Sequence, residues 1–295
     1  MGGPAAARRD IVALTGLLPD SHVDCFADAL PHDRLSFMPT WKLTIEYKGT
    51  RYQGWQEQAE GRTVQGEIRK AAEDYFGEKV DLGGSGRTDA GVHALAQVAH
   101  LRATRKRPSA EIQWELNERL PYDIHILNID PRPERFHARH SALARCYLYQ
   151  ISVRRTAFAK DFVWWVKAPV NLNTIQNCAE LFEGRHDFWS FTERPLEQGS
   201  TIVVVEKVQV AREGDLILIR LVASHFLWKM VRRLVGTLAQ VGTGKLEPDK
   251  VKRLIKSRSA ETGPWTAPSA GLFLEQVLYP GDSVANLIRP GIPVG

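Results

Sequence analysis

The chain has 295 residues, a net charge of +5 and a sequence pI of about 9.1. Its 43% hydrophobic and 25% charged residues are ordinary for a soluble protein with a full core, and the length predicts one large or two ordinary domains. No apolar run approaches the roughly 20 residues that span a bilayer, so we expect no membrane partner. The positive charge permits a polyanionic partner.

The cysteine content argues against stabilisation by disulfides or zinc. Cys25, Cys146 and Cys178 are odd in number and widely spaced, which gives neither a disulfide framework nor a zinc site. We therefore expect no metal and a cytoplasmic protein, since a reducing cytosol suits free thiols.

Predicted elements begin after residues 1–40, an N-terminal extension whose role cannot be deduced from the sequence. Alternating apolar residues predict a strand over 41–47, and apolar residues at helical spacing predict a helix over 64–76. Further strands are expected at 79–82, 96–101 and 124–129, with a helix from Pro108 to Leu120 between the last two. This order is the split βαβ pattern of a ferredoxin-like half, residues 41–135.

The second half, residues 136–280, is expected to repeat this pattern. A long strand is predicted over 144–153 and a helix over 172–182, followed by a hairpin of 202–210 with 216–222 around Gly214-Asp215. Apolar spacing from Phe226 to Leu238 predicts another helix, followed by a shorter one over 248–257 and a last strand over 271–279. Residues 281–295 form a Pro/Gly-rich tail. The predicted fold is α+β, with the two halves sharing a continuous antiparallel sheet, helices on one face and a central cleft.

The loop between the second and third strands carries an unusual set of side chains, Gly84-Ser85-Gly86-Arg87-Thr88-Asp89-Ala90-Gly91-Val92-His93. Its glycines allow close approach to the backbone, and its charged pair is presented between apolar runs. Structural alternatives remain open from the residues alone. Thr88 or Asp89 could cap a helical turn, and the Gly-rich backbone could form an anion-binding nest. The loop does not match the dinucleotide-binding fingerprint, because Asp89 stands where the fingerprint requires its third glycine.

Several segments together resemble one known family, in that family's order. Gly86–His93 is similar to the active-site signature of the TruA family of tRNA pseudouridine synthases. The other similar segments are Tyr47–Gln56, Thr63–Gly66, Phe136–Arg139, Arg145–Tyr149, Phe226 with Met230–Arg232 and Gly236, and Gly271–Leu274. The resemblance covers roughly residues 41 to 280.

The resemblance implies an activity and roles for individual residues. Asp89 falls on the family's catalytic carboxylate, Arg232 on the arginine expected to keep it ionised, and Tyr147 on a tyrosine that stacks on the target base. Arg87 falls on the arginine thought to assist base flipping. His93 is expected to be a packing residue. The implied reaction is conversion of uridine to pseudouridine at tRNA positions 38–40, by a homodimer and without a cofactor.

Clusters of basic residues support tRNA as the partner. Arg105 and Lys106 lie in a run of cations after the signature strand, and Arg139 lies in another, so all three are candidate RNA contacts. Some positions depart from the family pattern. His140 stands where Phe is expected, Trp228-Lys229 replaces a His pair, and Arg233 replaces a frequent Asn.

Two other functions remain to be weighed. A non-catalytic RNA-binding protein or RNA chaperone could use the same scaffold, although binding alone needs no carboxylate facing an anionic ligand. A nucleotide-dependent enzyme would use the Gly-rich loop to bind phosphate. The chain has neither the dinucleotide fingerprint nor the P-loop fingerprint that such binding would require.

Overall fold

The computed structural model describes residues 38–193 and 199–294, so most of the predicted N-terminal extension lies outside the described residues. The elements of the first half follow the predicted order: β1 (Thr40–Tyr47), α1 (Val64–Phe76), β2 (Asp81–Gly84), β3 (His93–Arg102), α2 (Ser109–Arg119) and β4 (Ile124–Arg132). β4 runs through Pro131, beyond the predicted strand. It lies at the edge of the sheet, where a missing N–H is tolerated.

The second half contains β5 (Ala144–Ser152), β6 (Trp164–Trp165), α3 (Leu172–Ala179), β7 (Gly184–Asp187), β8 (Ile202–Glu213), β9 (Leu216–Ala223), α4 (Met230–Gly242), α5 (Pro248–Lys256) and β10 (Leu272–Leu278). The predicted hairpin and last strand are confirmed. The predicted helix from Phe226 begins only at Met230, because Lys229 has left-handed backbone angles, with φ 59°. None of the described helices is both long and apolar enough to cross a membrane.

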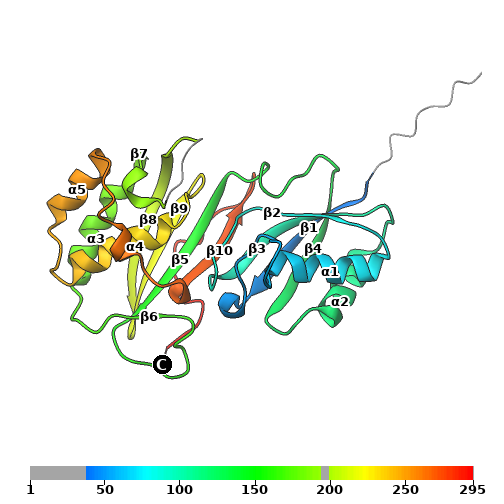
Figure 1. Cartoon of the computed structure of the whole chain (residues 1–295), viewed down its shortest axis with the longest axis horizontal. Helices are drawn as coiled ribbons and strands as arrows, with labels where there is room; N and C mark the ends of the chain where they lie inside the picture. The colour runs from blue at the N-terminus through cyan, green and yellow to red at the C-terminus, as the bar shows by residue number, and fades with distance from the viewer. Residues whose placement is uncertain (1–37, 194–198, 295) are drawn as a thin grey trace, which may run out of the picture. The chain divides into compact units, whose positions relative to one another are not determined.

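One large sheet runs through both halves, in the order β4-β1-β3-β10-β5-β9-β8-β7. β10 lies between β3 and β5 and joins the halves (Figure 1). The prediction of a wholly antiparallel sheet is wrong. β10 pairs antiparallel with β5 over six residue pairs, and this direction leaves it parallel to β3, where Phe273 pairs with His93 and Leu274 with Ala94. The sheet is therefore mixed.

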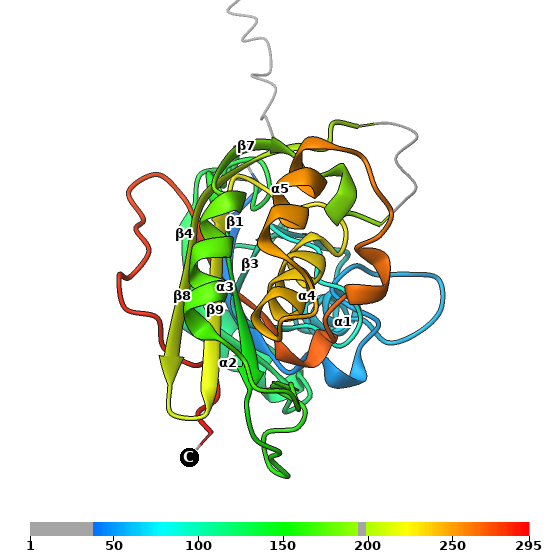
Figure 2. The ribbon, with the colours of Figure 1, turned by 90° about the vertical axis from the view of Figure 1, so that its left-hand side faces the viewer.

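The two faces of the central strands pack against different partners. On β5, Tyr147, Tyr149 and Ile151 belong to the main core, which also contains buried residues of α1, α2, α3 and α4. Leu148, in contrast, packs with Ile288 and a smaller apolar group on the opposite face. In Figure 2, α3 lies beside β8 and β9, and α4 and α5 lie on the far side of α3 from these strands. The strands are thus apolar on both faces, as expected for a sheet that is covered on both sides.

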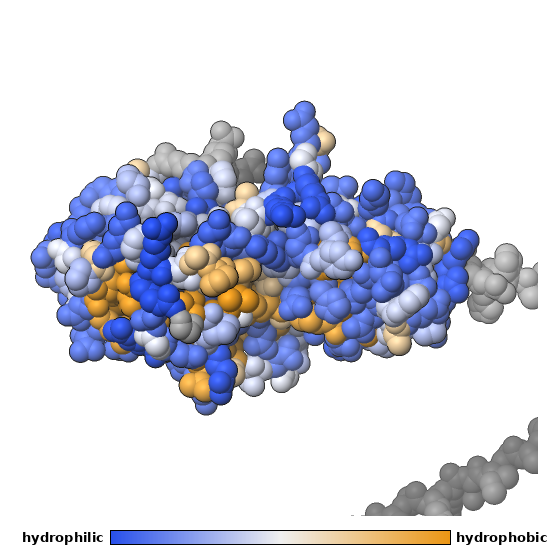
Figure 3. Space-filling view, turned by 90° about the horizontal axis from the view of Figure 1, so that it is seen from below, coloured by the Kyte–Doolittle hydropathy of each residue, from blue (hydrophilic) through white to orange (hydrophobic). Residues whose placement is uncertain are grey.

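The C-terminal segment 281–294 contains no helix or strand and covers part of the face opposite the helices. The fully buried Gln150 on β5 fixes it. The Gln150 Oε1 atom accepts hydrogen bonds from the backbone N–H of Gly291 at 2.6 Å and of Ile292 at 3.2 Å. Figure 3 shows the molecule from below, where apolar side chains gather in patches on a largely hydrophilic surface.

Close backbone approach positions α4. A Cβ atom at Gly236 would lie 1.6 Å from the carbonyl oxygen of Trp265, so only glycine allows the helix to lie this near to the segment before β10. The next residues of that segment hold Arg232 of the same helix. The N–H of Ala267 donates to the Arg232 carbonyl at 3.0 Å.

Candidate active site

A pocket of about 880 Å³ lies where the signature loop meets the start of α4. Three stretches of chain contribute most of its wall: 83–89 in the signature loop, 137–140 before β5, and 225–232 leading into α4. β5 contributes Arg145 and Tyr147. The structure therefore brings Arg87, Asp89, Tyr147 and Arg232 together, although they are spread over 146 positions of the sequence.

The signature loop is held by buried polar groups. The side-chain amide of Gln97, which is fully buried on β3, donates to the Gly86 carbonyl at 2.8 Å and accepts from the Gly86 N–H at 3.3 Å. The Thr88 carbonyl accepts from the Trp55 N–H at 3.0 Å, and the Thr88 hydroxyl bonds the Tyr47 hydroxyl at 2.7 Å. These contacts fix the backbone on both sides of Arg87.

Asp89 begins a tight turn and does not cap a helix. Its carbonyl accepts from the Val92 N–H at 3.1 Å, and Gly91 has φ 77°, as at the third position of a type II turn. Residues 85–92 contain no helical turn. The helix-cap interpretation is therefore wrong, and the Asp89 side chain is left facing the pocket.

Arg232 lies beside Asp89 and is itself fixed. Its Nη1 atom is 3.6 Å from the Asp89 Oδ2 atom, and its Nε atom donates to the Ala267 carbonyl at 2.7 Å. The same segment contacts the loop, since a Cβ at Gly91 would lie 2.6 Å from the Ser269 Oγ atom. One stretch before β10 therefore contacts both Arg232 and the loop that carries Asp89.

Burial dominates the ionisation of Asp89. Its side chain is only 25% exposed, and loss of hydration raises its pKa above the ordinary value of 3.8. The neighbouring charges of Arg232 and Lys229 and a hydrogen bond from the Trp228 side chain lower the pKa without cancelling the effect of burial. The sequence-based expectation that Arg232 favours the ionised form is right in sign, but the pKa as a whole is raised.

The charges around the pocket are strongly one-sided. Asp89 is the only carboxylate among the described residues that line it. Five lining residues are cationic: Arg87, Arg139, Arg145, Lys229 and Arg232. The pocket therefore fits an anionic ligand, and its one negative group stands out against this background.

Tyr147 is buried and neutral. Its exposed fraction is 7%, and its ring meets the edge of Phe226 at 5.0 Å and 83°. Burial, with Tyr47 and Asp89 nearby, raises the pKa of its hydroxyl far above the ordinary value of 10.0. Tyr147 therefore remains a phenol at neutral pH, suited to ring contact or to donating a proton, and it is not a ready base.

The predicted RNA-contact residues fall in two places. Arg87 and Arg139 are exposed and line the pocket. Arg105 and Lys106 do not line it. They come three and four residues after β3 ends at Arg102. Arg105 donates there to the Phe76 carbonyl at 3.2 Å.

His93 is a packing residue, as predicted. It is 1% exposed and packs against Phe162 and Phe273. Its Nδ1 atom accepts from the Gly49 N–H at 3.0 Å, and its Nε2 atom lies 2.9 Å from the Asp161 carbonyl.

Sequence reasoning missed the structural role of Arg145. In the sequence it appeared only as the first residue of a family-like segment, yet it is 9% exposed and makes no ion pair with the described carboxylates. Its guanidinium donates to the carbonyls of Ser85, Arg139 and Ser224 at 3.1, 2.8 and 3.1 Å. It therefore ties together the three stretches that form the pocket wall. No sequence pattern distinguishes such a buried arginine from an exposed one.

Lys229 was also missed as a component of the site. It lines the pocket with left-handed backbone angles, which are costly for a residue with a side chain, and its Nζ atom pairs with Glu193 at 2.7 Å. Arg233 pairs with the same carboxylate at 3.2 Å. The departures at 229 and 233 are therefore coupled through Glu193, and the Lys229 charge also acts on Asp89.

Comparison with known proteins identifies the class to which this site belongs. The family model described as tRNA pseudouridine synthase matches residues 43–141 and 178–280. The chain therefore belongs to the tRNA pseudouridine synthase family, and the sequence-based identification is confirmed.

Individual relatives agree with this assignment. The chain is 39% identical over 247 residues to tRNA pseudouridine synthase A of Sinorhizobium fredii, covering 82% of this chain and 100% of the relative. The protein of the same name from Allorhizobium ampelinum is 39% identical over 250 residues, covering 83% and 96%. That from Brucella ovis is 37% identical over 247 residues, covering 82% and 98%.

The raised pKa of Asp89 predicts that Asp89→Asn melts at a higher temperature than the wild type near pH 7. A carboxyl whose folded pKa is raised contributes stability below its unfolded pKa, and that contribution is lost as the pH rises through the folded pKa. Asparagine does not ionise, so the variant does not lose this stability at neutral pH. The difference in melting temperature between the variant and the wild type should shrink as the pH falls toward 3.8, which melting curves over this range will measure.

Asp161→Asn is the matched control, with the opposite sign. The Lys48 ammonium, 2.8 Å away, lowers the pKa of Asp161, so this variant should melt below the wild type at pH 7. A lower melting temperature for Asp89→Asn at pH 7 would contradict the burial argument.

Proposed function

We propose that this protein converts uridine to pseudouridine in tRNA, with Asp89 as the essential carboxylate. The observation that carries the proposal is the position of Asp89. Among the described residues it is the only carboxylate that lines a pocket with five cations, in a chain of the tRNA pseudouridine synthase family. A site that only held RNA would gain nothing from a negative charge at this point.

The reaction is an isomerisation. The bond between N1 of uracil and C1′ of ribose breaks and a bond between C5 and C1′ forms, while the proton on C5 is lost and N1 gains one. No electrons are transferred to a second molecule, so the proposal requires no cofactor. Asp89 acts as a nucleophile, at C6 of the base or at C1′, or as the base that removes the C2′ proton. A raised pKa strengthens it in each of these roles, while Arg232 limits the rise.

The other pocket residues position the nucleotide. Tyr147 contacts the face of the uracil ring, and its neutral phenol donates or exchanges a proton there. The target uridine must leave its stack, at a cost of a few kcal/mol. Arg87 is exposed at the pocket edge. Its side chain fills the space that the uridine leaves and holds the displaced RNA backbone. Arg139 contacts the flanking phosphates.

The substrate site proposed is the anticodon stem-loop, at tRNA positions 38–40. Support comes from the similarity of Gly86–His93 and its companion segments to the TruA signature. Incubation of unmodified tRNA transcripts with the protein, followed by mapping of pseudouridine at single-nucleotide resolution, tests this. Modification confined to other positions would contradict it.

We further propose that residues 41–135 and 136–280 are two ferredoxin-like halves and that the pocket is part of a cleft between them. The strand order supports this, because β4-β1-β3-β2 in one half corresponds to β10-β5-β9-β8 in the other. A chain severed between the halves and mixed as two fragments should reassemble if each half is a folding unit. Failure of either fragment to form structure would argue against it.

The assembly and location remain proposals. A cytoplasmic homodimer is what the family resemblance implies, and exposed apolar side chains such as Phe158 and Leu287 are compatible with a protein interface. A monomeric mass by light scattering at micromolar concentration would exclude the dimer.

Arg105 and Lys106 are proposed to contact the tRNA outside the pocket, because both are exposed cations that do not line it. Reversing both charges should weaken binding of all tRNAs alike, and the affinity of the wild type should fall steeply with salt as counterions are released. Filter binding over a salt series measures both. Unchanged affinity between low and moderate salt would contradict the contact.

Asp89→Asn should abolish pseudouridine formation and leave tRNA affinity intact or slightly improved. The amide keeps the shape of the side chain but is a poor nucleophile and base, so the chemical step should fall by several orders of magnitude. Removing a negative charge from a pocket for a polyanion does not weaken attraction. Single-turnover conversion and filter binding on one preparation separate the two effects.

The same experiment with Arg232→Ala should give a milder loss of rate, because Arg232 adjusts Asp89 and does not perform the chemistry. Activity of Asp89→Asn within tenfold of the wild type would show that Asp89 is not the essential carboxylate. That result would favour the alternative that the protein is a non-catalytic RNA-binding protein.

A further inference from the structure

Three histidines form a column of rings in contact beside the pocket, with each pair of ring planes tilted by 49°. The ring centroids of His100 and His137 lie 4.4 Å apart, and those of His137 and His140 lie 4.3 Å apart. His100 is on β3, and the other two are in the turn before β5. The column therefore runs from the sheet to the surface, since His100 is 2% exposed and His140 is exposed.

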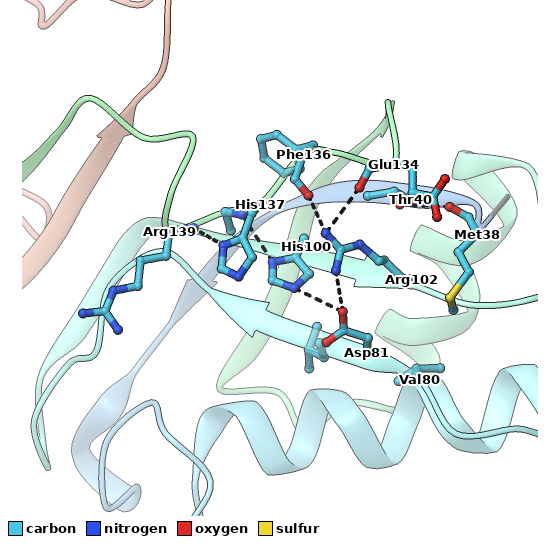
Figure 4. A network of polar contacts seen from close by, with 12 residues as sticks. Met38, Thr40, Val80, Asp81, His100, Arg102, Glu134, Phe136, His137 and Arg139 are labelled. Carbon is cyan, nitrogen blue, oxygen red and sulfur yellow. Dashed lines mark hydrogen bonds and ion pairs between the residues drawn. The ribbon is translucent and has the colours of Figure 1, made fainter. Parts of the chain in front are cut away.

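The base of the column is held by hydrogen bonds and charges in the sheet. Figure 4 shows His100 between His137 and Asp81. The His100 Nδ1 atom accepts from the Ala138 N–H at 3.2 Å, and its Nε2 atom lies 3.6 Å from the Asp81 Oδ2 atom. Asp81 is fixed by Arg102 at 2.7 Å. Burial lowers the pKa of His100 to about 4, so this ring is neutral at physiological pH.

The middle ring is also oriented. The His137 Nδ1 atom accepts from the N–H of Arg139 at 3.1 Å and of His140 at 3.4 Å. Burial is the largest cause that lowers its pKa, followed by the nearby His140. His137 therefore uses its nitrogen to hold its own turn and its ring faces to contact the neighbouring histidines.

Other uses of these histidines fit the geometry poorly. Among the described residues, no group of three or more His, Cys, Asp or Glu side chains is placed to hold a metal ion. A proton relay would need hydrogen bonds from ring to ring, but the Nδ1 atoms of His100 and His137 are occupied by backbone N–H groups. What the column provides is contact between neighbouring aromatic rings that reaches the pocket.

The top of the column faces the proposed substrate. His137, Arg139 and His140 line the same pocket as Asp89. In Figure 4 the Arg139 side chain extends away from the His137 and His100 rings. A flat ring with a cation beside it is the arrangement with which proteins hold unpaired bases and their phosphates.

We propose that His140 is a stacking platform for an unpaired base next to the target uridine, with Arg139 contacting the phosphate of that nucleotide. This rests on the proposed function, because it takes the ligand to be RNA. The platform is a second binding subsite, separate from the uracil position at Asp89 and Tyr147. The His137 ring contacts the His140 ring, and the His140 backbone N–H donates to the His137 Nδ1 atom, which limits the ordering needed when RNA binds.

The test compares His140→Ala with His140→Phe, which keeps a flat ring. His140→Ala should weaken tRNA binding about tenfold, whereas His140→Phe should stay within about threefold of the wild type. His125→Ala removes an exposed histidine on β4 outside the pocket and should bind as the wild type does. Filter binding at fixed salt measures all four proteins, and melting curves confirm that each is folded.

A second arm keeps the protein unchanged and removes single bases from the RNA. Stem-loops with one abasic nucleotide at each position near the target should include one that binds the wild type about tenfold more weakly. The same abasic stem-loop should bind His140→Ala no worse than the intact stem-loop does. Equal affinity of His140→Ala and wild type for intact RNA, with no abasic position that distinguishes them, would overturn the platform.

The outcomes also separate this proposal from the proposed function. If the wild type forms no pseudouridine, the function fails, but the two binding arms still report on the platform. If His140→Ala binds and reacts as the wild type does, the platform fails and the catalytic assignment stands.

Discussion

The constraint on which this site depends is that Asp89, the only carboxylate among the described residues lining a cationic pocket, has most of its side chain withdrawn from water. Burial disfavours the charge and raises the pKa, and Arg232 and Lys229 oppose that rise. A carboxylate held in this balance is more basic than an exposed one. Burying this carboxylate lowers the folding stability of the protein, and such a loss of stability is common at functional sites.

The architecture brings the two partners of this balance together from opposite halves of the chain. Asp89 lies four residues before β3, and Arg232 lies in the first turn of α4. β10 pairs with β3 at His93 and Ala94. In the segment before β10, Ala267 forms hydrogen bonds with both the side chain and the backbone carbonyl of Arg232. The parallel pairing of β10 is thus more than a detail of topology. It sets the distance between the charges.

Much of this could be predicted from the sequence, for identifiable reasons. Apolar periodicity gave most helices and strands, and the dense signature around Asp89 gave the loop and the family. The start of α4 was misplaced because Phe226 continues the apolar spacing, although its ring packs on Tyr147 ahead of the helix. The strands β6 and β7 are too short to leave a pattern.

Other features are invisible to sequence patterns because they depend on contacts between distant segments. The buried state of Arg145 arises from three carbonyls in separate stretches of chain. The net pKa of Asp89 depends on burial, which spacing cannot give. Arg105 does not line the pocket, although it follows the signature loop and β3 closely in the sequence.

The dependence of the single-turnover rate on pH, under saturating protein, tests the balance around Asp89 most directly. The rate should fall on the acid side with a midpoint above 3.8, and Arg232→Gln should move that midpoint to higher pH by removing a charge that lowers the pKa. Arg253→Gln, which removes an exposed cation outside the pocket, should leave it unchanged. A midpoint at or below 3.8, or one that Arg232→Gln leaves in place, would contradict the account.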